Sequence, residues 1–563
     1  MCNTKGDAVA YSVRHPNVLR PMRQPINVSI LEHLYFLRFE VENHFDLVEA
    51  FVTRPRSSIA QRLINRKGYR KTLVEKVDLS VAMDVQRRKV DGPAFQRSKS
   101  LERLARLLDQ LGQACIEFTD IESLAETSDK RYKDYAKLIR RVRKSLALVI
   151  INPEDANTRQ GLKIGRRAAK LSASLKETSA QRTPPPKGTQ DASPVLHFQI
   201  HRMILLLREL ADALLAANFG PAVRLQNYKQ LRDAAHAYTE DGGSFGVERL
   251  ALTRSGSTIA ALKAEHDSSR EFMAVYKEGQ AEKVLEEVSG VDQWKQVYPK
   301  VAPTVLSHHV EQETDLGSMM IEHLPGRTLE ALLLNSQWDD ARLLISELGK
   351  TLRKIWKSSR TKERAEPRYM QQLRNRMPET RQAHPSLFSE GQVICGMSRP
   401  RFNALMDEVE TLEKTIRAPF SVLIHGDFNV DNLIFDDLKN RIYFIDLHRA
   451  SYSDYVQDLS VLMVSIYRLP VMDPAPRAEM MALIRELYLF ARRFAKSNKD
   501  SSFDVRLAIA LARSFATSTR FIYDTGFARR LAFRSGYLLE TVARLDPEKL
   551  EKFKLPLEEI FSD

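Results

Sequence analysis

The chain has 563 residues, 43% of them hydrophobic and 28% charged, and a formal net charge of +14 at pH 7. This length exceeds what one hydrophobic core usually supports, so we expect more than one domain. No apolar run reaches the roughly 20 residues that a membrane-spanning helix needs, and three scattered cysteines do not suggest a disulfide framework. The basic residues are interleaved with acidic ones and accompany no zinc-finger or RNA-binding motif. We therefore expect a cytoplasmic protein with no membrane span and no nucleic-acid partner.

The N-terminal part of the sequence has helical periodicity. After a polar, disordered lead-in over residues 1–25, apolar residues recur at three- and four-residue steps at Leu34, Leu37, Val41, Phe45 and Val48. Further amphipathic runs cover 59–64, 98–124, 132–149, 197–219 and 226–238. A proline-rich loop over 178–194 interrupts them, since proline lacks the backbone donor. Residues 26–240 are thus predicted to form an all-α helical bundle.

The periodicity changes after Gly242-Gly243. Strand patterns cover 247–252, 259–263, 272–277 and 317–322, and a helical pattern covers 281–297. Helical patterns then dominate to the C-terminus, except for a predicted strand pair formed by 421–425 and 442–446. We expect a small antiparallel lobe over 241–325 and a mostly helical lobe, with a helical substrate-binding subdomain, over 326–563. The fold class predicted for the whole chain is α+β.

The strongest chemical signal is the segment from Val422 to Phe435, followed by Ile442-Tyr443-Phe444-Ile445-Asp446. An apolar strand leads into the polar loop His425-Gly426-Asp427, and a later strand ends on a single acid. Phosphoryl transfer needs a carboxylate that orients the attacking hydroxyl and oxygen ligands for magnesium. Asp427 suits the base, and Asn432 and Asp446 suit the metal. The alternative, that these residues only form turns, requires both segments to match by chance.

This segment resembles the catalytic loop of the aminoglycoside phosphotransferase and choline-kinase families, and the resemblance extends over roughly residues 245–540. It implies a protein-kinase-like bilobal fold that uses ATP and Mg²⁺. It also implies that Asp427 is the catalytic base, that Asn432 and Asp446 hold magnesium, and that His425 braces the loop. Asp458, at the start of a later helical run, is predicted to have a structural role as a helix cap or as a bond to the catalytic loop.

A lobe that binds nucleotide should lie upstream of this loop. Ser255, Gly256 and Ser257 lie between two predicted strands, where backbone N–H groups could cover the phosphates, although such turns are also common in hairpins. Lys277 ends the next strand and is predicted to contact the α- and β-phosphates; the alternative is an edge-strand lysine. Its acidic partner is predicted to be Glu286, with Glu287 nearly as suitable. By resemblance, adenine binds backbone groups around Glu322, His323 and Leu324.

The acceptor is expected to be a hydroxyl of a small molecule. The C-terminal helical region carries several arginines, and guanidinium groups bind phosphate and carboxylate well. These are Arg513, Arg520, Arg529, Arg530 and Arg534. They favour an anionic or neutral acceptor over a cationic one, unless they form salt bridges on a solvated face. Two alternatives stay open, a nucleotide-binding regulator or scaffold without catalysis and a kinase that acts on a macromolecule.

The bundle contains Leu101-Glu102-Arg103, which resembles a helix of the PhoU-type phosphate-uptake regulators. Glu42 and Asp46, one turn apart, fit the same plan loosely, but Arg106 stands where that motif has its final aspartate. A generic amphipathic bundle is the alternative. Because the bundle has no catalytic constellation, we expect it to sense a ligand, to dock a protein partner or to form a homo-oligomer.

Overall fold

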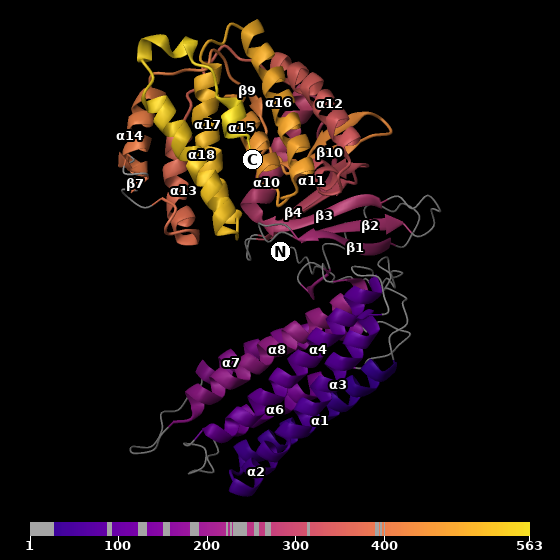
Figure 1. The fold of residues 1–563 in the computed structure, drawn as a ribbon. Coiled ribbons are helices and arrows are strands. Elements are labelled where there is room, and N and C mark those ends of the chain that lie inside the picture. Colours follow the sequence, from indigo (N-terminus) through magenta and orange to yellow (C-terminus); the bar gives the residue numbers. More distant parts are fainter. Residues whose placement is uncertain are drawn as a thin grey trace, which may run out of the picture. The chain divides into compact units, whose positions relative to one another are not determined.

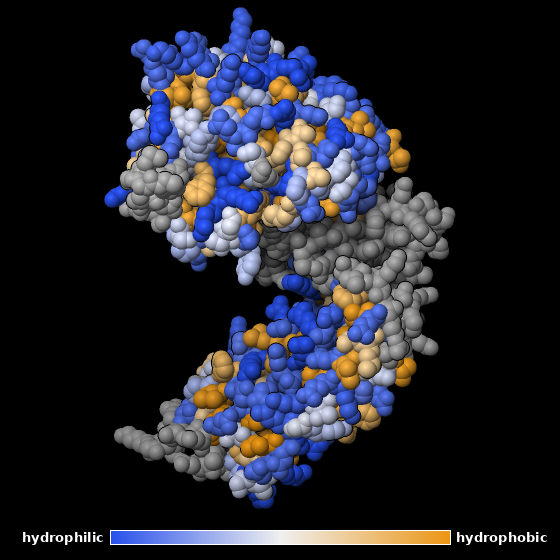
Figure 2. All heavy atoms as spheres, in the orientation of Figure 1, coloured by the Kyte–Doolittle hydropathy of each residue, from blue (hydrophilic) through white to orange (hydrophobic). Residues whose placement is uncertain are grey.

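The computed structural model divides the chain into two compact units, Met1–Glu278 and Gly279–Asp563. The division falls inside strand β3 (Phe272–Gln280), whereas the domain boundaries predicted at 240 and 325 stay predictions. Figure 1 shows the fold, and Figure 2 shows that hydrophilic side chains cover much of the visible surface, with hydrophobic residues scattered between them. The described residues are 28–86, 93–121, 132–149, 158–180, 191–220, 223–225, 228, 245–252, 258–264, 272–311, 316–388, 393–394, 397–398 and 400–562.

A bundle of long helices precedes the strands, as predicted (Figure 1). Its elements are α1 (Val28–Thr53), α2 (Ser57–Asn65), α3 (Lys67–Gln86), α4 (Pro93–Ile116), η1 (Glu117–Asp120), α6 (Lys133–Leu146), α7 (Thr158–Ala180) and α8 (Ser193–Phe219). The apolar face predicted from Leu34 to Val48 is fully buried on α1. The helical run predicted over 226–238 lies outside the described residues, apart from Tyr228.

One bundle helix, α3, has no clear apolar period in the sequence. The buried face of α3 includes Arg70 and Asp84 beside Leu73, Val77 and Val81. Arg70 is 1% exposed, and its Nε donates to Asp109 Oδ1 on α4 at 2.6 Å. A buried charge needs such a partner. This pairing allows a charged residue to occupy a core position. The apolar pattern of α3 is therefore interrupted in the sequence.

Five strands form one sheet in the order β1-β2-β3-β5-β4. They include β1 (Phe245–Leu252), β2 (Thr258–Ala264), β4 (Val305–Glu311) and β5 (Leu316–Glu322). The pairs β1–β2, β2–β3 and β4–β5 are antiparallel. Helix α10 (Ala281–Val297) follows β3 at the predicted position. The patterns predicted as strands are confirmed, and β4 is an additional strand that the sequence patterns did not indicate.

The rest of the second unit is mostly helical. Its helical elements are α11 (Leu329–Leu334), α12 (Trp338–Ser358), α13 (Tyr369–Ala383), α14 (Phe402–Glu413), α15 (Val456–Tyr467), α16 (Pro474–Ser497), α17 (Phe503–Ser518), η4 (Thr519–Phe521), α18 (Thr525–Ala543), η5 (Pro547–Lys552) and α19 (Leu557–Ile560). One hydrophobic core runs through them from Val291 to Phe561. Among the described residues, no helix is long and apolar enough to span a membrane.

Short strands lie among these helices, and one predicted pairing is wrong. The strands are β6 (Arg327–Thr328), β7 (Val393–Ile394), β8 (Met397–Ser398), β9 (Val422–Ile424), β10 (Leu433–Asp436), β11 (Arg441–Phe444) and β12 (Ser451–Ser453). We expected β9 to pair with β11, but β9 pairs with β12, and β11 pairs with β10. The reason is local, because β10 and β11 are joined by a tight turn in which Asn440 has φ 50°. A small antiparallel sheet before a helical lobe gives the α+β, protein-kinase-like fold, which is confirmed.

Candidate active site

The loop between β9 and β10 reverses direction at Gly426. Its φ is +81°, in the left-handed region that favours glycine. A side chain at this position would collide with the chain, because a Cβ would lie 2.4 Å from the carbonyl oxygen of Arg449. This glycine therefore lets the loop pass close to residues 446–450, and Asp427 follows it directly.

Each carboxylate oxygen of Asp427 contacts another side chain. Asn429 Nδ2 donates to Oδ1 at 2.8 Å, and Arg449 Nη1 lies 3.3 Å from Oδ2. The Asp427 side chain keeps 24% of its surface exposed, so it remains accessible to a reactant. A carboxylate that is oriented and accessible can take a proton from a bound hydroxyl.

Asn432 and Asp446 are brought together by the β10–β11 hairpin. Leu433 pairs with Phe444, and the bond from Ile445 N to the Asn432 carbonyl oxygen, at 3.1 Å, extends this pairing by one step. The Asn432 amide nitrogen, Nδ2, donates to the Asp427 carbonyl oxygen at 2.8 Å. That bond leaves the amide oxygen as the atom available for a cation. Asn432 is therefore hydrogen-bonded to Asp427, and Asp446 directly follows the residue whose backbone bonds to Asn432.

The backbone of Asp446 has a positive φ angle. Its φ is +64°, in the left-handed region that few residues other than glycine, asparagine and aspartate adopt, and its side chain is 34% exposed. His448 Nδ1 lies 3.2 Å from Asp446 Oδ1. Backbone strain of this kind is often found at functional sites, where surrounding contacts maintain it.

The donor set of this site fits magnesium. Within the described ranges, no group of three or more His, Cys, Asp or Glu side chains is placed to hold a metal ion. Magnesium does not require such a group, because it is usually bound by one or two carboxylates together with substrate phosphates and water. One carboxylate at Asp446 and one amide oxygen at Asn432 match that requirement.

Asp458, at the start of α15, holds the loop by two bonds. Its Oδ2 accepts from His425 N at 2.7 Å, and its Oδ1 accepts from Gly426 N at 2.9 Å. Of the two predicted structural roles, the bond to the catalytic loop is therefore the one observed. Burial raises the pKa of the Asp458 carboxyl to about 7, although the two backbone bonds oppose that shift.

His425 is completely buried beneath the same loop. Its Nε2 lies 2.9 Å from the Ile445 carbonyl oxygen, and its Nδ1 accepts from Asp427 N at 3.3 Å. One nitrogen donates and the other accepts, which requires the neutral imidazole. Burial also lowers the pKa of His425, which favours the same neutral form. The ring thus links the segment before Asp446 to the segment that carries Asp427.

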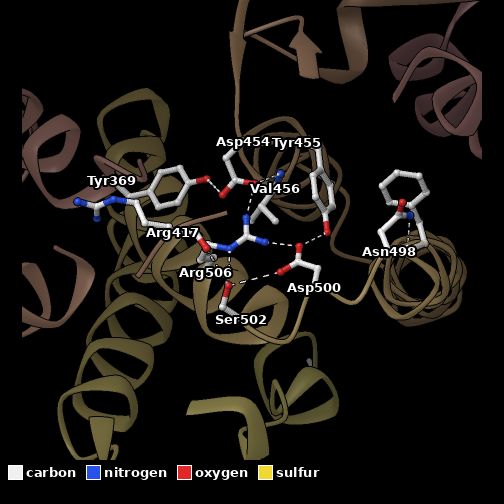
Figure 3. Close-up of polar contacts among 10 residues, drawn as sticks. Tyr369, Arg417, Asp454, Tyr455, Val456, Asn498, Asp500, Ser502 and Arg506 are labelled. Atoms are coloured by element: carbon white, nitrogen blue, oxygen red, sulfur yellow. Dashed lines mark hydrogen bonds and ion pairs between the residues drawn. The ribbon is translucent and has the colours of Figure 1, made fainter. Parts of the chain in front are cut away.

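A buried ion network fixes the helices behind this loop (Figure 3). Arg506 on α17 is fully buried and forms ion pairs with Asp454 and Asp500. The Tyr369 hydroxyl donates to Asp454 at 2.9 Å, and the Tyr455 hydroxyl donates to Asp500 at 2.6 Å. This network anchors α17 beside the start of α15, from which Asp458 reaches the catalytic loop.

Two glycines allow neighbouring elements to pack on the catalytic hairpin. A Cβ at Gly290 on α10 would lie 2.1 Å from the Leu447 carbonyl oxygen, directly after Asp446. A Cβ at Gly326, where φ is +111°, would lie 2.1 Å from the Phe435 carbonyl oxygen on β10. Larger residues would displace these contacts. Both α10 and the segment after β5 are therefore built against the hairpin that carries Asn432 and Asp446.

The residues predicted to bind nucleotide are only partly described. Ser255, Gly256 and Ser257 lie outside the described residues. Lys277 is half-buried on β3 and pairs in register with Ile259. On α10, Glu286 is exposed, whereas Glu287 is 5% exposed and lies on the buried face. Burial thus favours Glu287, the alternative to our first choice, as the inward-facing acid.

The predicted hinge follows β5 in the second unit. Glu322 N donates to the Thr304 carbonyl oxygen at 2.9 Å. Glu322 and His323 are half-buried, and Leu324 is 7% exposed. Thr328 then caps α11 by accepting from Ala331 N at 3.1 Å. Hydrogen bonds thus hold both ends of this segment.

The five C-terminal arginines do not act as one group. Arg529 and Arg530 are exposed on α18, and Arg534 Nε donates to the Ile560 carbonyl oxygen at 2.6 Å, far along the chain from the catalytic loop. Arg513 and Arg520 instead interact electrostatically with Asp427. Sequence reasoning missed Arg449 and Arg468, which reach the loop from segments whose proximity only the fold reveals.

Comparisons with known proteins found a matching family model and similar solved structures. A family model described as the phosphotransferase enzyme family matches residues 258–494. Among solved structures, the chain is similar to a thermostable mutant of the aminoglycoside phosphotransferase APH(4)-Ia, with 13% identity over 55% of this chain and 99% of that one and a TM-score of 0.35. It is also similar to choline kinase from Cryptosporidium parvum, with 12% identity over 56% of this chain and 96% of that one and a TM-score of 0.34.

No curated protein matches the sequence. The family match does not reach residues 26–240, so the likeness of the bundle to PhoU-type regulators is not supported. In that bundle, Glu42 and Asp46 form ion pairs with Arg38 and Arg143. The family match supports phosphoryl transfer to a small molecule as the activity. At residues 258–494, the chain carries a domain of the phosphotransferase enzyme family.

Proposed function

We propose that this protein transfers the γ-phosphoryl group of ATP, with Mg²⁺ as cofactor, to a hydroxyl group of a small molecule. The observation that carries this proposal is the bond from Asn432 Nδ2 to the Asp427 carbonyl oxygen, together with the bond from Ile445 N to the Asn432 carbonyl oxygen. The first bond joins the proposed base segment to Asn432, and the second holds Ile445, the residue directly before Asp446, against Asn432.

In this proposal, Asp427 orients the acceptor hydroxyl and takes its proton. As the acceptor oxygen forms a bond to the γ-phosphorus, the bond from that phosphorus to the bridging oxygen breaks, and ADP leaves. Asn429 and Arg449 hold the Asp427 carboxylate in one orientation. Most of the rate enhancement in such a reaction comes from positioning and charge stabilisation.

Asn432 and Asp446 would hold the cation through the Asn432 amide oxygen and the Asp446 carboxylate. When bound, Mg²⁺ supplies positive charge that neutralises the phosphate oxygens during transfer. Asp458 and His425 would act by positioning, because their side chains are engaged with the backbone of the loop.

For the nucleotide, we propose that Lys277 contacts the α- and β-phosphates and that Glu287 is its acidic partner. Ser255, Gly256 and Ser257 would cover the phosphates through backbone N–H groups, and the backbone from Glu322 to Leu324 would bind adenine. We further propose that the helical bundle has a regulatory or docking role, through a protein partner or a second copy of the chain.

The proposal is tested with the full-length protein, γ-labelled ATP, Mg²⁺ and a pool of hydroxyl-bearing metabolites. We expect label in a small molecule, and we expect Asp427→Asn to lower turnover by at least about 100-fold. ATP binding, measured by calorimetry, should remain close to wild type in that variant. Asp431→Asn, the same change at an exposed position of the same loop, is the matched control and should retain activity.

Two results would contradict the proposal. Wild-type turnover by Asp427→Asn would remove the assigned base. Label that accumulates in protein or nucleic acid, with none in the metabolite pool, would show that the acceptor is a macromolecule. ATP binding without any transfer would instead favour a regulator that reports nucleotide occupancy.

A further inference from the structure

Positive charge is concentrated around the Asp427 carboxylate. Arg449 lies 3.3 Å from Oδ2, and its side chain is 50% exposed. On the other side, Arg468 Nη2 donates to Asn429 Oδ1 at 3.0 Å, and Asn429 in turn binds Asp427 Oδ1. One guanidinium thus contacts the proposed base directly, and a second reaches it through one amide.

A third guanidinium, that of Arg520 on η4, belongs to the same group. The Cζ atoms of Arg468 and Arg520 lie 5.7 and 4.5 Å from the centroid of the Phe521 ring. This ring is 52% exposed, although it is flanked by charged groups. Burial lowers the pKa of Arg520, and the neighbouring guanidinium groups of Arg376 and Arg449 lower it further. The carboxylates of Glu379 and Asp427 oppose this shift.

Element η4 is held in place by a buried histidine. His384 Nε2 lies 3.1 Å from the carbonyl oxygen of Thr519 and 2.8 Å from that of Ile522. These two carbonyls flank Arg520 and Phe521 in the chain. The position of Arg520 near the catalytic loop is therefore fixed by the fold and does not depend on a flexible loop.

The acidic groups nearby do not balance these arginines. Glu379 lies 3.3 Å from both Arg520 and Arg376, so one carboxylate serves two guanidinium groups. Asp427 also contacts the group, through Arg449. Farther in, Arg513 interacts with Asp458 and Glu413, and burial raises the pKa of each of these carboxyls to about 7. Guanidinium groups that are close together and partly buried repel each other, and a bound anion reduces this repulsion.

Arg520 also has unused hydrogen-bonding capacity. Its Nη1 is buried and makes no hydrogen bond, although it lies 3.3 Å from Glu379. The side chain is 19% exposed, so another face of it can be reached. A guanidinium group binds phosphate or carboxylate through paired hydrogen bonds. Such an anion would approach the exposed part of the Arg520 side chain, while Nη1 stays paired with Glu379.

We propose that the acceptor carries an anionic group, a phosphate or a carboxylate, in addition to the hydroxyl that is phosphorylated, and that Arg449 and Arg520 bind this group. The inference rests on the proposed function and specifies its acceptor. Arg468 is a positioning residue, since it holds Asn429. A polycationic acceptor would be repelled by the same three guanidinium groups.

The first test separates pooled hydroxyl-bearing metabolites into anionic, neutral and cationic fractions and measures phosphorylated products in each with Mg²⁺ and ATP. We expect product in the anionic fraction. We also expect Arg449→Ala and Arg520→Ala each to raise the acceptor KM by about tenfold or more, the loss typical of one charge-assisted hydrogen bond. Arg529→Ala removes the same charge from an exposed site on α18 and should leave KM unchanged.

The second test measures the binding of inorganic phosphate by calorimetry and does not depend on turnover. We expect the Arg449→Ala/Arg520→Ala double variant to weaken binding by about tenfold or more, and Arg529→Ala, at an exposed site on α18, to leave it unchanged. Partial rescue by Arg520→Lys would support a charge contact. Product only in the neutral or cationic fraction would overturn the inference but not the proposed function. Unchanged phosphate affinity in the double variant would also overturn it, whether or not any fraction yields product.

Discussion

At the scale of single residues, the catalytic loop depends on groups that we do not place in contact with either reactant. Asp458 uses both carboxylate oxygens to accept backbone N–H groups of His425 and Gly426. His425 uses both ring nitrogens, one for the Ile445 carbonyl and one for Asp427 N. Each of these side chains therefore has little tolerance for a substitution that removes one acceptor or donor.

For Asp458→Asn, we expect kcat to fall by about 10- to 100-fold, with little change in the KM for ATP. The amide offers one acceptor oxygen, and its NH₂ group would face a backbone N–H that it cannot satisfy. Steady-state kinetics of the variant and of the Asp431→Asn control would measure this effect. A wild-type kcat for Asp458→Asn would show that the loop keeps its shape without these two bonds.

The two adjacent glutamates of α10 provide a second residue-scale prediction. Because Glu287 is 5% exposed and Glu286 is exposed, only the former lies on the inward face of the helix. We expect Glu287→Gln to lower kcat/KM for ATP by about tenfold or more, as expected for loss of an ion pair that orders the phosphate-binding lysine. Glu286→Gln should remain near wild type. The reverse order of effects would restore Glu286 as the partner of Lys277.

At the scale of elements, the C-terminal helices are fixed by buried polar contacts as well as by apolar packing. Glu413 on α14 accepts from Tyr369 N at 2.7 Å and from Met370 N at 3.2 Å, and so caps the start of α13. Burial raises the pKa of Glu413 to about 7, although these backbone bonds oppose the shift. The folded protein therefore binds a proton at Glu413 more tightly than the unfolded chain does.

The raised pKa of Glu413 makes the stability of the folded protein depend on pH. Between about pH 4.5 and 7, the folded state holds a proton on Glu413 that the unfolded state has released, so the contribution of Glu413 to stability falls as pH rises through this range. The effect amounts to roughly 3 kcal/mol at most. All three tryptophans, Trp294, Trp338 and Trp356, lie in the second unit, so their fluorescence follows its unfolding.

For Glu413→Gln, we expect the free energy of unfolding to improve relative to wild type as pH rises from 5 to 8, because the amide does not titrate. Urea denaturation followed by tryptophan fluorescence at several pH values would measure the difference. Parallel pH curves for the two proteins would show that Glu413 titrates with an ordinary pKa in the fold.

At the scale of the whole molecule, the described residues contain two separate hydrophobic cores. One runs from Ile30 to Ala217 and involves only residues of the bundle, and the other runs from Val291 to Phe561. Because each core is composed of residues from one unit, each has the apolar burial that a folded domain needs.

We therefore expect the fragment 26–240 to be helical and to unfold cooperatively on its own. Circular dichroism with thermal denaturation would measure both properties, and the full-length protein provides the reference for helical content. A fragment with a random-coil spectrum would show that the bundle depends on the rest of the chain and would remove the case for a separate regulatory or docking domain.

Sequence alone predicted those features that depend on neighbouring residues. The loop from His425 to Asn432 and the strand that ends before Asp446 are contiguous, so their residue types and spacing were informative. The partner of β9 was predicted wrongly, because strand pairing is decided by contacts between distant segments. Helix α3 has no clear apolar period because Arg70 and Asp84 are buried on it. Arg449 and Arg468 gave no signal, since only the fold brings them to Asp427.

The most direct test of the central claim is to locate the cation. Crystals of the full-length protein grown with Mn²⁺ and a non-hydrolysable ATP analogue would reveal manganese by its anomalous scattering. We expect a peak within about 2.2 Å of the Asn432 amide oxygen and of an Asp446 carboxylate oxygen, beside the nucleotide phosphates. A nucleotide bound with its cation away from both residues, or bound elsewhere on the protein, would contradict the account.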